Sequence, residues 1–168
     1  MAVSIALAIQ KRTQVAVIYL PMLNELYTAT EGGGCFLNGQ PSRVSSVSTL
    51  KESMITTNVG KLRLSNEKRQ LFASDILSLI PNCHQVQMVN SACCQLCFVA
   101  CGRVEAYIER AVGGPWDTAA GDLLVREAGG IMSGYNGPFD CMTCSVMAVC
   151  NKGILNELKS LLPKADDL

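Results

Sequence analysis

The sequence has no excess of charge of either sign, few aromatic residues and a single histidine. Lys and Arg together number 14, as do Asp and Glu, so the formal charge at pH 7 is zero. A nucleic-acid-binding surface needs clustered basic residues to displace counterions, so this balance argues against nucleic acid as a partner. Hydrophobic residues make up 49% of the chain and charged residues 17%, which excludes a disordered chain.

Long apolar runs are also missing. No run approaches the roughly 20 residues that a helix needs to cross a bilayer. Met1–Ile9 is apolar, but the basic pair Lys11-Arg12 follows it, which reverses the order of a secretory signal peptide. We therefore expect a soluble, cytoplasmic chain with no membrane partner. Its 168 residues are enough for one domain.

The nine cysteines include two Cys-x-x-Cys pairs, Cys94/Cys97 and Cys141/Cys144. Four thiolates could hold zinc, but the gap between the pairs exceeds the roughly 15–20 residues of common zinc ribbons. The first pair also lies in a segment of small residues with helical spacing, at 91–101. Buried free cysteine behaves as a small apolar residue, so core packing is the preferred interpretation. A thiol-based metal or redox site is the alternative.

Two other features could carry chemistry. His84 lies in a polar turn with no Ser or Cys nucleophile pattern beside it, so we interpret it as a surface histidine. Gly32–Gly34 follows a predicted strand and has no helix behind it, which favours a bulge or a bend over a phosphate-binding loop.

The first part of the chain has the pattern of strands joined by short turns. Apolar strands are predicted at Val3–Ile9, Gln14–Leu20 and Glu25–Thr30. Asn38-Gly39 is typical of a tight hairpin, because both residues tolerate positive φ. We expect these strands to form an antiparallel meander.

From residue 50 onward, strands alternate with helices, which is typical of helices packed on a mixed sheet. The predicted fold class is α/β. Residues 1–49 are assigned to an N-terminal antiparallel sheet subdomain and residues 50–168 to a C-terminal α/β subdomain. The predicted strands are 53–59, 85–89, 104–108, 131–133 and 146–150, and the predicted helices are one capped by Ser65, one in the cysteine-rich segment, and those at 117–128 and 153–162.

The segment 113–130 is the most informative part of the chain. A Gly-Pro turn precedes Trp116, and Asp117 lies at the predicted start of a helix. A carboxylate at this position suits two roles, because it can cap the helix or bind a ligand. The pattern alone leaves both roles open. Asp122 and Arg126 have the i,i+4 spacing of a surface ion pair.

Trp116-Asp117-Thr-Ala-Ala-Gly121, followed by Glu127-Ala-Gly-Gly130, resembles the second signature motif of the inositol monophosphatase family. Three further segments occur in the family's order and at about its spacing. They are Val3-Ser-Ile-Ala-Leu-Ala8, Gly34-Cys-Phe-Leu-Asn-Gly39 and Leu96-Cys-Phe-Val-Ala-Cys-Gly102. The resemblance covers nearly the whole chain.

This resemblance implies a layered α/β sandwich that commonly dimerises. It also implies Mg²⁺-dependent hydrolysis of small phosphate monoesters, usually inositol monophosphate, in which metal ions polarise the phosphate and activate a water. By the resemblance, Asp117 is a metal ligand that also lies beside the small-molecule substrate. Asn90, Ser91 and Ala92 match the loop that contacts the inositol ring, and Glu109 matches a glutamate that binds a ring hydroxyl. The segment from Glu109 to Asp117 is one residue longer than usual, so Glu105 is an alternative.

The chain also departs from the family. An earlier metal-binding glutamate and the motif Asp-Pro-x-Asp-Gly-Thr are absent, and Met1 aligns just after that motif. The acidic residues in the first 60 positions are Glu25, Glu31 and Glu52, which match no such pattern. One aspartate cannot hold a multi-metal cluster. We therefore expect an N-terminally truncated chain that lacks normal phosphatase activity alone and retains no catalytic residue.

Exposed sheet edges in such a chain would favour association. We expect a homodimer or association with a full-length subunit. The alternative function is that of a non-catalytic truncated isoform that acts as a binding or dimerisation partner.

Overall fold

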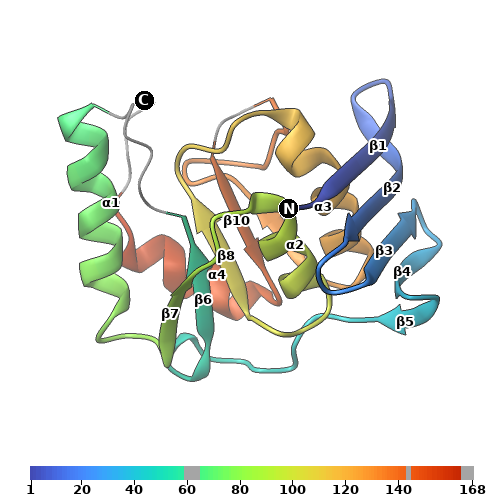
Figure 1. The fold of residues 1–168 in the computed structure, drawn as a ribbon. Helices are drawn as coiled ribbons and strands as arrows, with labels where there is room; N and C mark the ends of the chain where they lie inside the picture. The colour runs from blue at the N-terminus through green and yellow to red at the C-terminus, as the bar shows by residue number, and fades with distance from the viewer. Residues whose placement is uncertain (59–64, 143–144, 164–168) are drawn as a thin grey trace.

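Two β-sheets with a pair of helices between them form the frame of the molecule. The computed structural model describes residues 1–58, 65–142 and 145–163, and these residues contain two five-stranded sheets and four α-helices (Figure 1). The predicted α/β class is confirmed.

The first sheet is an antiparallel meander, as predicted. Its turns contain residues with positive φ, among them Gln10 and Lys11 between the first two strands and the pair Asn38 and Gly39. The left-handed conformation that a tight hairpin needs is therefore supplied locally. The strands, in the order in which they pair, are β1 (Val3–Ile9), β2 (Arg12–Leu20), β3 (Glu25–Thr30), β4 (Gly34–Leu37) and β5 (Gln40–Ser42).

The second sheet is mixed and has the strand order β7-β6-β8-β10-β9. β6 is parallel to both β7 and β8, whereas β10 is antiparallel to β8 and β9. The central parallel pair places the ends of β6 and β8 side by side. The strands are β6 (Met54–Thr57), β7 (Gln85–Met88), β8 (Ala106–Glu109), β9 (Ile131–Ser133) and β10 (Val146–Val149).

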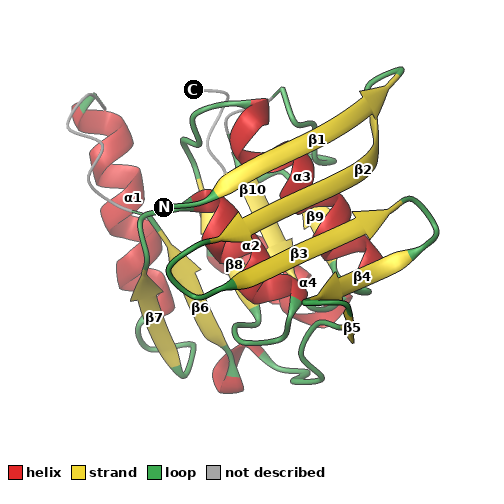
Figure 2. Ribbon diagram, turned by 45° about the vertical axis from the view of Figure 1, so that its right-hand side comes forward, coloured by secondary structure: helices red, strands yellow, loops and turns green. Residues whose placement is uncertain are grey.

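Helices cover both faces of the second sheet. α2 (Ala92–Ala100) and α3 (Pro115–Glu127) lie between the two sheets, whereas α1 (Asn66–Leu79) and α4 (Lys152–Leu161) pack on the other face (Figure 2). The second sheet has a hydrophobic core on each face, and alternate side chains of β8 belong to one or the other. Tyr107 faces α2 and α3, whereas its neighbours in the strand face α1 and α4.

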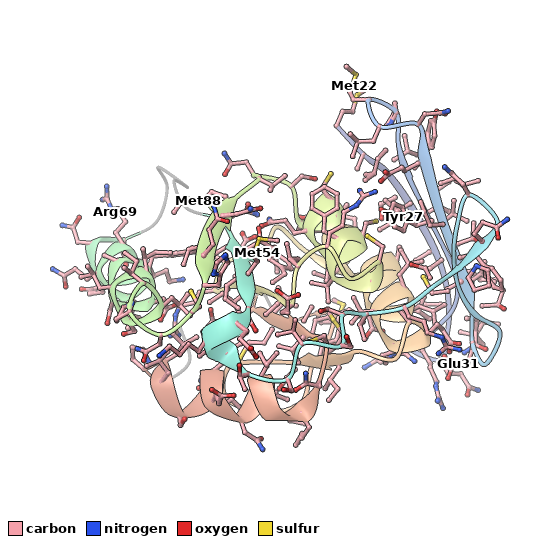
Figure 3. The ribbon with its side chains drawn as sticks, turned by 90° about the horizontal axis from the view of Figure 1, so that it is seen from below. Met22, Tyr27, Glu31, Met54, Arg69 and Met88 are labelled. Atoms are coloured by element: carbon pink, nitrogen blue, oxygen red, sulfur yellow. The ribbon has the colours of Figure 1, made fainter. Side chains whose placement is uncertain are left out.

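The meander packs on α2 and α3 through its inner face. Tyr27 of β3 is fully buried and points toward α2, where its hydroxyl lies 3.5 Å from the Cys101 sulfur (Figure 3). The carboxylate of Glu127, at the end of α3, also holds the loop Gly32–Gly34. It accepts hydrogen bonds from the backbone N–H of Gly32 and Gly34, both at 2.8 Å. The loop is a turn in which the Gly33 backbone N–H donates to the Thr30 carbonyl at 2.8 Å, where a bulge or a bend was predicted.

Two helix starts test the capping predictions. Ser65 caps α1, because its side chain accepts a hydrogen bond from the Lys68 backbone N–H. α3 begins at Pro115 and not at the predicted Asp117. Proline is favoured at the first helical position because its fixed φ suits the helix and its missing N–H has no intrahelical partner there.

A buried ion pair fixes α1 to the end of β8. Arg110 donates to Asp75 through Nε at 2.6 Å and through a terminal nitrogen at 2.8 Å, and both side chains are buried. The guanidinium also stacks on the Tyr135 ring at 4.0 Å. This contact holds the segment just after Glu109 in place.

The outer face and edge of the first sheet remain exposed. Val3, Ile5, Leu7 and Ile9 on β1 are between 48% and 61% exposed. Where the structure describes the chain, no helix is both long and apolar enough to span a membrane. His84 is exposed in the turn before β7, as predicted.

Candidate active site

The predicted site residues come from the start of α2, the end of β8 and the first turn of α3. Asn90 has a φ of 57°, which turns the chain sharply into α2. The Ser91 side chain then caps the helix by accepting a hydrogen bond from the Cys94 backbone N–H at 3.4 Å. The next backbone N–H groups, beginning with that of Ala92, belong to the first helical turn, where such donors can bind an anion.

The first turns of α2 and α3 touch each other. The Cys93 thiol lies 3.5 Å from the backbone carbonyl of Asp117. Further along, Gly121 packs directly on Leu96, since a Cβ at position 121 would lie 2.3 Å from the Leu96 Cδ1 atom. The small residues of the Trp-Asp motif thus allow α3 to lie close to α2. Two positive helix ends are thereby placed next to each other.

Asp117 does not cap α3. The N-cap residue is Gly114, which has no side chain that could cap the helix, and Asp117 lies in the first turn. Its carboxylate folds back over Gly113, because a Cβ at position 113 would lie only 2.3 Å from the Asp117 Oδ2 atom. Asp117 is half-buried, and none of the described residues donates a hydrogen bond to its carboxylate. This arrangement favours the ligand role over the capping role.

Glu109 ends β8 and is only 2% exposed. Its Oε2 atom accepts a hydrogen bond from the Asn58 side-chain amide at 2.6 Å and another from the Tyr107 hydroxyl. Burial, followed by the negative charge of Glu109, raises the pKa of Tyr107 well above its usual value, so Tyr107 remains a hydroxyl donor. The carboxylate is held firmly on the side of the sheet that faces α2 and α3.

Glu105, the alternative to Glu109, lies before the start of β8. Its Oε2 atom accepts a hydrogen bond from the Met54 backbone N–H at 2.6 Å, and the residue is 6% exposed. This carboxylate serves the pairing of β6 with β8 at the opposite end from Glu109. We therefore retain Glu109 for the site.

Four residues of the same region were not singled out from the sequence. Thr56, Asn58, Gln95 and Tyr107 form hydrogen bonds that lead to Glu109. Two of them carry a signal in the sequence. Gln95 is a polar residue inside an otherwise apolar helix, and Asn58 directly follows a buried strand.

The family resemblance implies Mg²⁺, which needs oxygen donors. Asp117 offers one carboxylate beside two helix starts. Within 1–58, 65–142 and 145–163, no three His, Cys, Asp or Glu side chains come together as a metal-binding group. Mg²⁺ binds through one or two carboxylates together with waters and substrate phosphate oxygens. The described residues therefore fit a single ligand to Mg²⁺ and not a multi-metal cluster.

The cysteines of α2 pack in the core. Cys93 and Cys97 are buried, Cys94 is half-buried, and burial raises the pKa of all three thiols. A raised pKa keeps a thiol protonated and unreactive at neutral pH. Every described cysteine is a free thiol. Cys144 lies outside the described residues, so the second Cys-x-x-Cys pair is not described in full.

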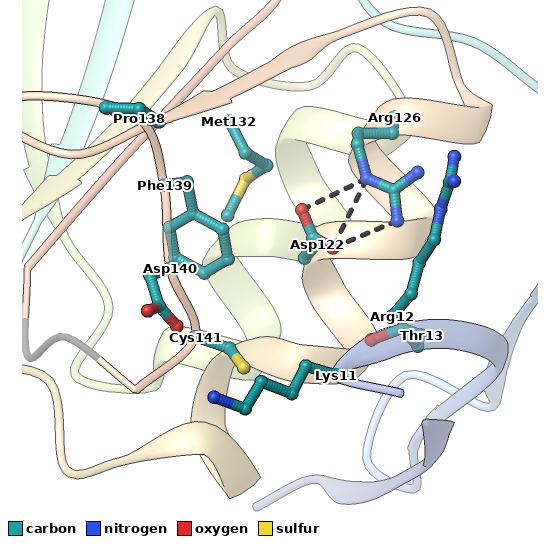
Figure 4. A pocket seen from close by; sticks show the side chains of 10 residues that line it. All are labelled: Lys11, Arg12, Thr13, Asp122, Arg126, Met132, Pro138, Phe139, Asp140 and Cys141. Carbon is teal, nitrogen blue, oxygen red and sulfur yellow. Dashed lines mark hydrogen bonds and ion pairs between the residues drawn. The ribbon is translucent and has the colours of Figure 1, made fainter. Parts of the chain in front are cut away.

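A pocket of about 570 Å³ lies further along α3, between that helix, the β1–β2 hairpin and the segment 138–141 (Figure 4). None of the predicted site residues lines it. Its guanidinium groups are already paired, because Arg126 binds Asp122 at 3.0 Å and Arg12 binds Glu31 at 2.6 Å. Its lining residues are Lys11, Arg12, Thr13, Asp122, Arg126, Met132, Pro138, Phe139, Asp140 and Cys141.

Comparisons with known proteins agree with this architecture. The model of the inositol monophosphatase family matches residues 1–165. An inositol monophosphatase from Dictyostelium discoideum is 40% identical over 161 residues, which cover 95% of this chain and 58% of the relative.

Two solved structures have the same fold. The extragenic suppressor protein SuhB from Bartonella henselae is 32% identical with a TM-score of 0.89, and the match covers 98% of this chain and 62% of that one. The inositol monophosphatase from Anabaena (Nostoc) sp. PCC 7120 is 34% identical with a TM-score of 0.88, covering 97% and 66%. The chain thus spans less than two thirds of the length of these proteins.

Proposed function

The chain belongs to the inositol monophosphatase family, and we propose that its site takes part in the Mg²⁺-dependent hydrolysis of small phosphate monoesters in the cytoplasm. The proposed substrate is inositol monophosphate, and the products are inositol and phosphate. The observation that carries the proposal is the meeting of the starts of α2 and α3 beside the carboxylate of Asp117, to which no described residue donates a hydrogen bond.

In this proposal each group has a separate task. The carboxylate of Asp117 binds Mg²⁺, which when bound would polarise the phosphate. Asn90, Ser91 and Ala92 at the start of α2 offer backbone N–H groups to substrate oxygens. Glu109 accepts a hydrogen bond from a ring hydroxyl, and the hydrogen bonds from Asn58 and Tyr107 hold its carboxylate for that contact.

We also propose that residues 1–168 alone turn over substrate slowly. The sequence contains no Asp-Pro-x-Asp-Gly-Thr segment, and one aspartate together with phosphate oxygens holds a single Mg²⁺ weakly. Binding and turnover therefore need separate tests.

Binding can be followed through Trp116. It is the single tryptophan, it is 71% exposed, and it precedes Asp117 directly. We expect its fluorescence to change on titration with inositol 1-phosphate in the presence of Mg²⁺. Asp117→Asn should weaken the apparent affinity in this titration at least about tenfold. Asp122→Asn on the same helix is the matched control and should leave the response unchanged. If the unaltered chain gives no response, the proposed function is wrong.

Turnover is measured as phosphate release from inositol 1-phosphate with and without Mg²⁺. We expect release far below that of a full-length relative measured in parallel. A rate comparable to that of the relative would contradict the proposed slow turnover by residues 1–168. It would not contradict the proposed substrate.

The exposed apolar residues of β1 favour a second candidate, in which the chain is a non-catalytic partner of a full-length subunit or of a second copy of itself. β1 is an unprotected edge strand without charge or proline. Co-expression with a full-length relative should then give co-purification, which Ile5→Lys and Leu7→Lys should abolish. A chain that stays monomeric and is not retained by the relative would exclude this role.

A further inference from the structure

A line of side-chain hydrogen bonds connects α2 with the end of the second sheet. The Thr56 hydroxyl donates to Oε1 of Gln95, and Nε2 of Gln95 donates to Oδ1 of Asn58 at 2.7 Å. Nδ2 of Asn58 then donates to Oε2 of Glu109 at 2.6 Å. Thr56 and Gln95 are fully buried. The line therefore runs through the interior and ends on the candidate substrate-binding carboxylate.

The direction of these hydrogen bonds is set at one end. A carboxylate can only accept, so Glu109 turns the amino group of Asn58 toward itself. The Asn58 carbonyl then faces Gln95, whose amino group must point to it and whose carbonyl must point to Thr56. The Thr56 hydroxyl can donate or accept, so it adapts to either direction. Among the four described residues of this line, Glu109 is the one whose charge distinguishes the two directions.

We propose that Asn58 and Gln95 are positioning residues that hold the Glu109 carboxylate in place for substrate. The proposal rests on the proposed function for what Glu109 binds. A buried carboxylate is costly unless it is hydrogen-bonded, and a glutamate side chain has several rotatable bonds. The amide of Asn58, just after β6, and the hydroxyl of Tyr107, on β8, meet the same oxygen, Oε2. Gln95 extends this restraint to α2, the helix whose start offers the other substrate contacts.

The first experiment uses NMR on the ¹⁵N-labelled chain without ligand. Glu109→Gln keeps the size of the side chain and removes the charge that sets the direction. We expect the side-chain amide signals of Gln95 to shift or to double in Glu109→Gln, although Asn58 stands between the two residues. Gln95 signals that stay unchanged would overturn the proposal. This neutral substitution is mild, so the experiment does not depend on a drastic variant that fails to fold.

The second experiment exchanges donor and acceptor. Asn58→Asp places two carboxylates against each other, and we expect the folding equilibrium constant at pH 7, from urea unfolding, to fall at least about tenfold. Combining it with Glu109→Gln restores a donor opposite an acceptor and should recover most of that loss. Asn66→Asp, at the exposed first residue of α1, is the control and should cost little. A double variant as unstable as Asn58→Asp would contradict the proposal.

The third measurement tests whether the carboxylate has to stand at residue 109, the place where Asn58 and Gln95 would hold it. The rescued double variant folds but carries its charge on residue 58, so its Trp116 response to inositol 1-phosphate should remain weak. A fully restored response would overturn the positioning role. If the unaltered chain shows no response while the two ligand-free experiments succeed, the proposed function fails and the hydrogen-bonded line stands.

Discussion

Replacing either of two buried threonines by valine should change the free energy of unfolding, in opposite directions at the two positions. Thr118 lies in the first turn of α3 with 0% exposure, and its hydroxyl is the one buried side-chain polar atom in the described part of the chain that has no hydrogen-bond partner. Thr56 is equally buried, but its hydroxyl donates to Gln95. Replacement by valine keeps the branched shape and removes only the hydroxyl.

The expected magnitudes follow from the state of each hydroxyl. A buried polar group without a partner costs about 1–3 kcal/mol, so Thr118→Val should raise the free energy of unfolding by about 1 kcal/mol. Thr and Val have similar helix propensities, which leaves the hydroxyl as the main difference. Thr56→Val leaves the Gln95 carbonyl unpaired and should lower the free energy of unfolding by about 1–3 kcal/mol, despite the higher strand propensity of valine.

The assay is urea unfolding at pH 7 followed by far-ultraviolet circular dichroism, with thermal midpoints as a second measure. A gain of 1 kcal/mol corresponds to roughly 2–4 °C in a chain of this size. A loss of stability in Thr118→Val, equal in sign to that in Thr56→Val, would show that the Thr118 hydroxyl does have a partner. That result would refute the reasoning.

Two further predictions concern close packing and pH. Gly121→Ala should destabilise the chain by about 1–3 kcal/mol and weaken the Trp116 response, because the new Cβ would lie 2.3 Å from Leu96 Cδ1 and would push α3 away from α2. Urea unfolding and fluorescence titration measure the two effects. An unchanged Trp116 response would show that the spacing of the two helices is unimportant for binding. The hydrogen bond from Arg103 lowers the pKa of Glu25 below its ordinary value of 4.5, so the ion pair stabilises the fold above that pH and is lost as the pH falls through the lowered value. Glu25→Gln should therefore lower the free energy of unfolding by about 0.5 kcal/mol at pH 7, a small effect because the pair is partly exposed, and should have no effect in strong acid. A loss of stability that is the same at low pH would show that the ion pair is not its cause.

Much of the fold was predictable because its local signals agree with each other. Apolar segments separated by short turns predicted β1 to β3, and the Asn38-Gly39 pair predicted the hairpin between β4 and β5. Boundaries were less certain where a cap or a proline decides them, as at Pro115. The division into residues 1–49 and 50–168 remains a prediction.

The candidate site was only partly predictable. Family resemblance indicated Asp117, the loop at Asn90 and Glu109, and the structure brings their elements together. The choice between cap and ligand for Asp117 could not be made from spacing, because both roles place a carboxylate at a helix start. Only the position of its carboxylate over Gly113 favoured one of them.

The periodicity of the sequence by itself determined the α/β class. The resemblance of its motifs to the inositol monophosphatase family indicated the family, which the comparisons show, and implied the residues that we propose for the candidate site. The tertiary structure decided what surrounds those residues. Thr56, Gln95 and Glu109 lie up to 53 positions apart (109 minus 56), yet one line of hydrogen bonds joins them. Such a network forms only when parallel strands and a buried helix are packed, because the low polarity of the interior requires each buried polar group to find a partner.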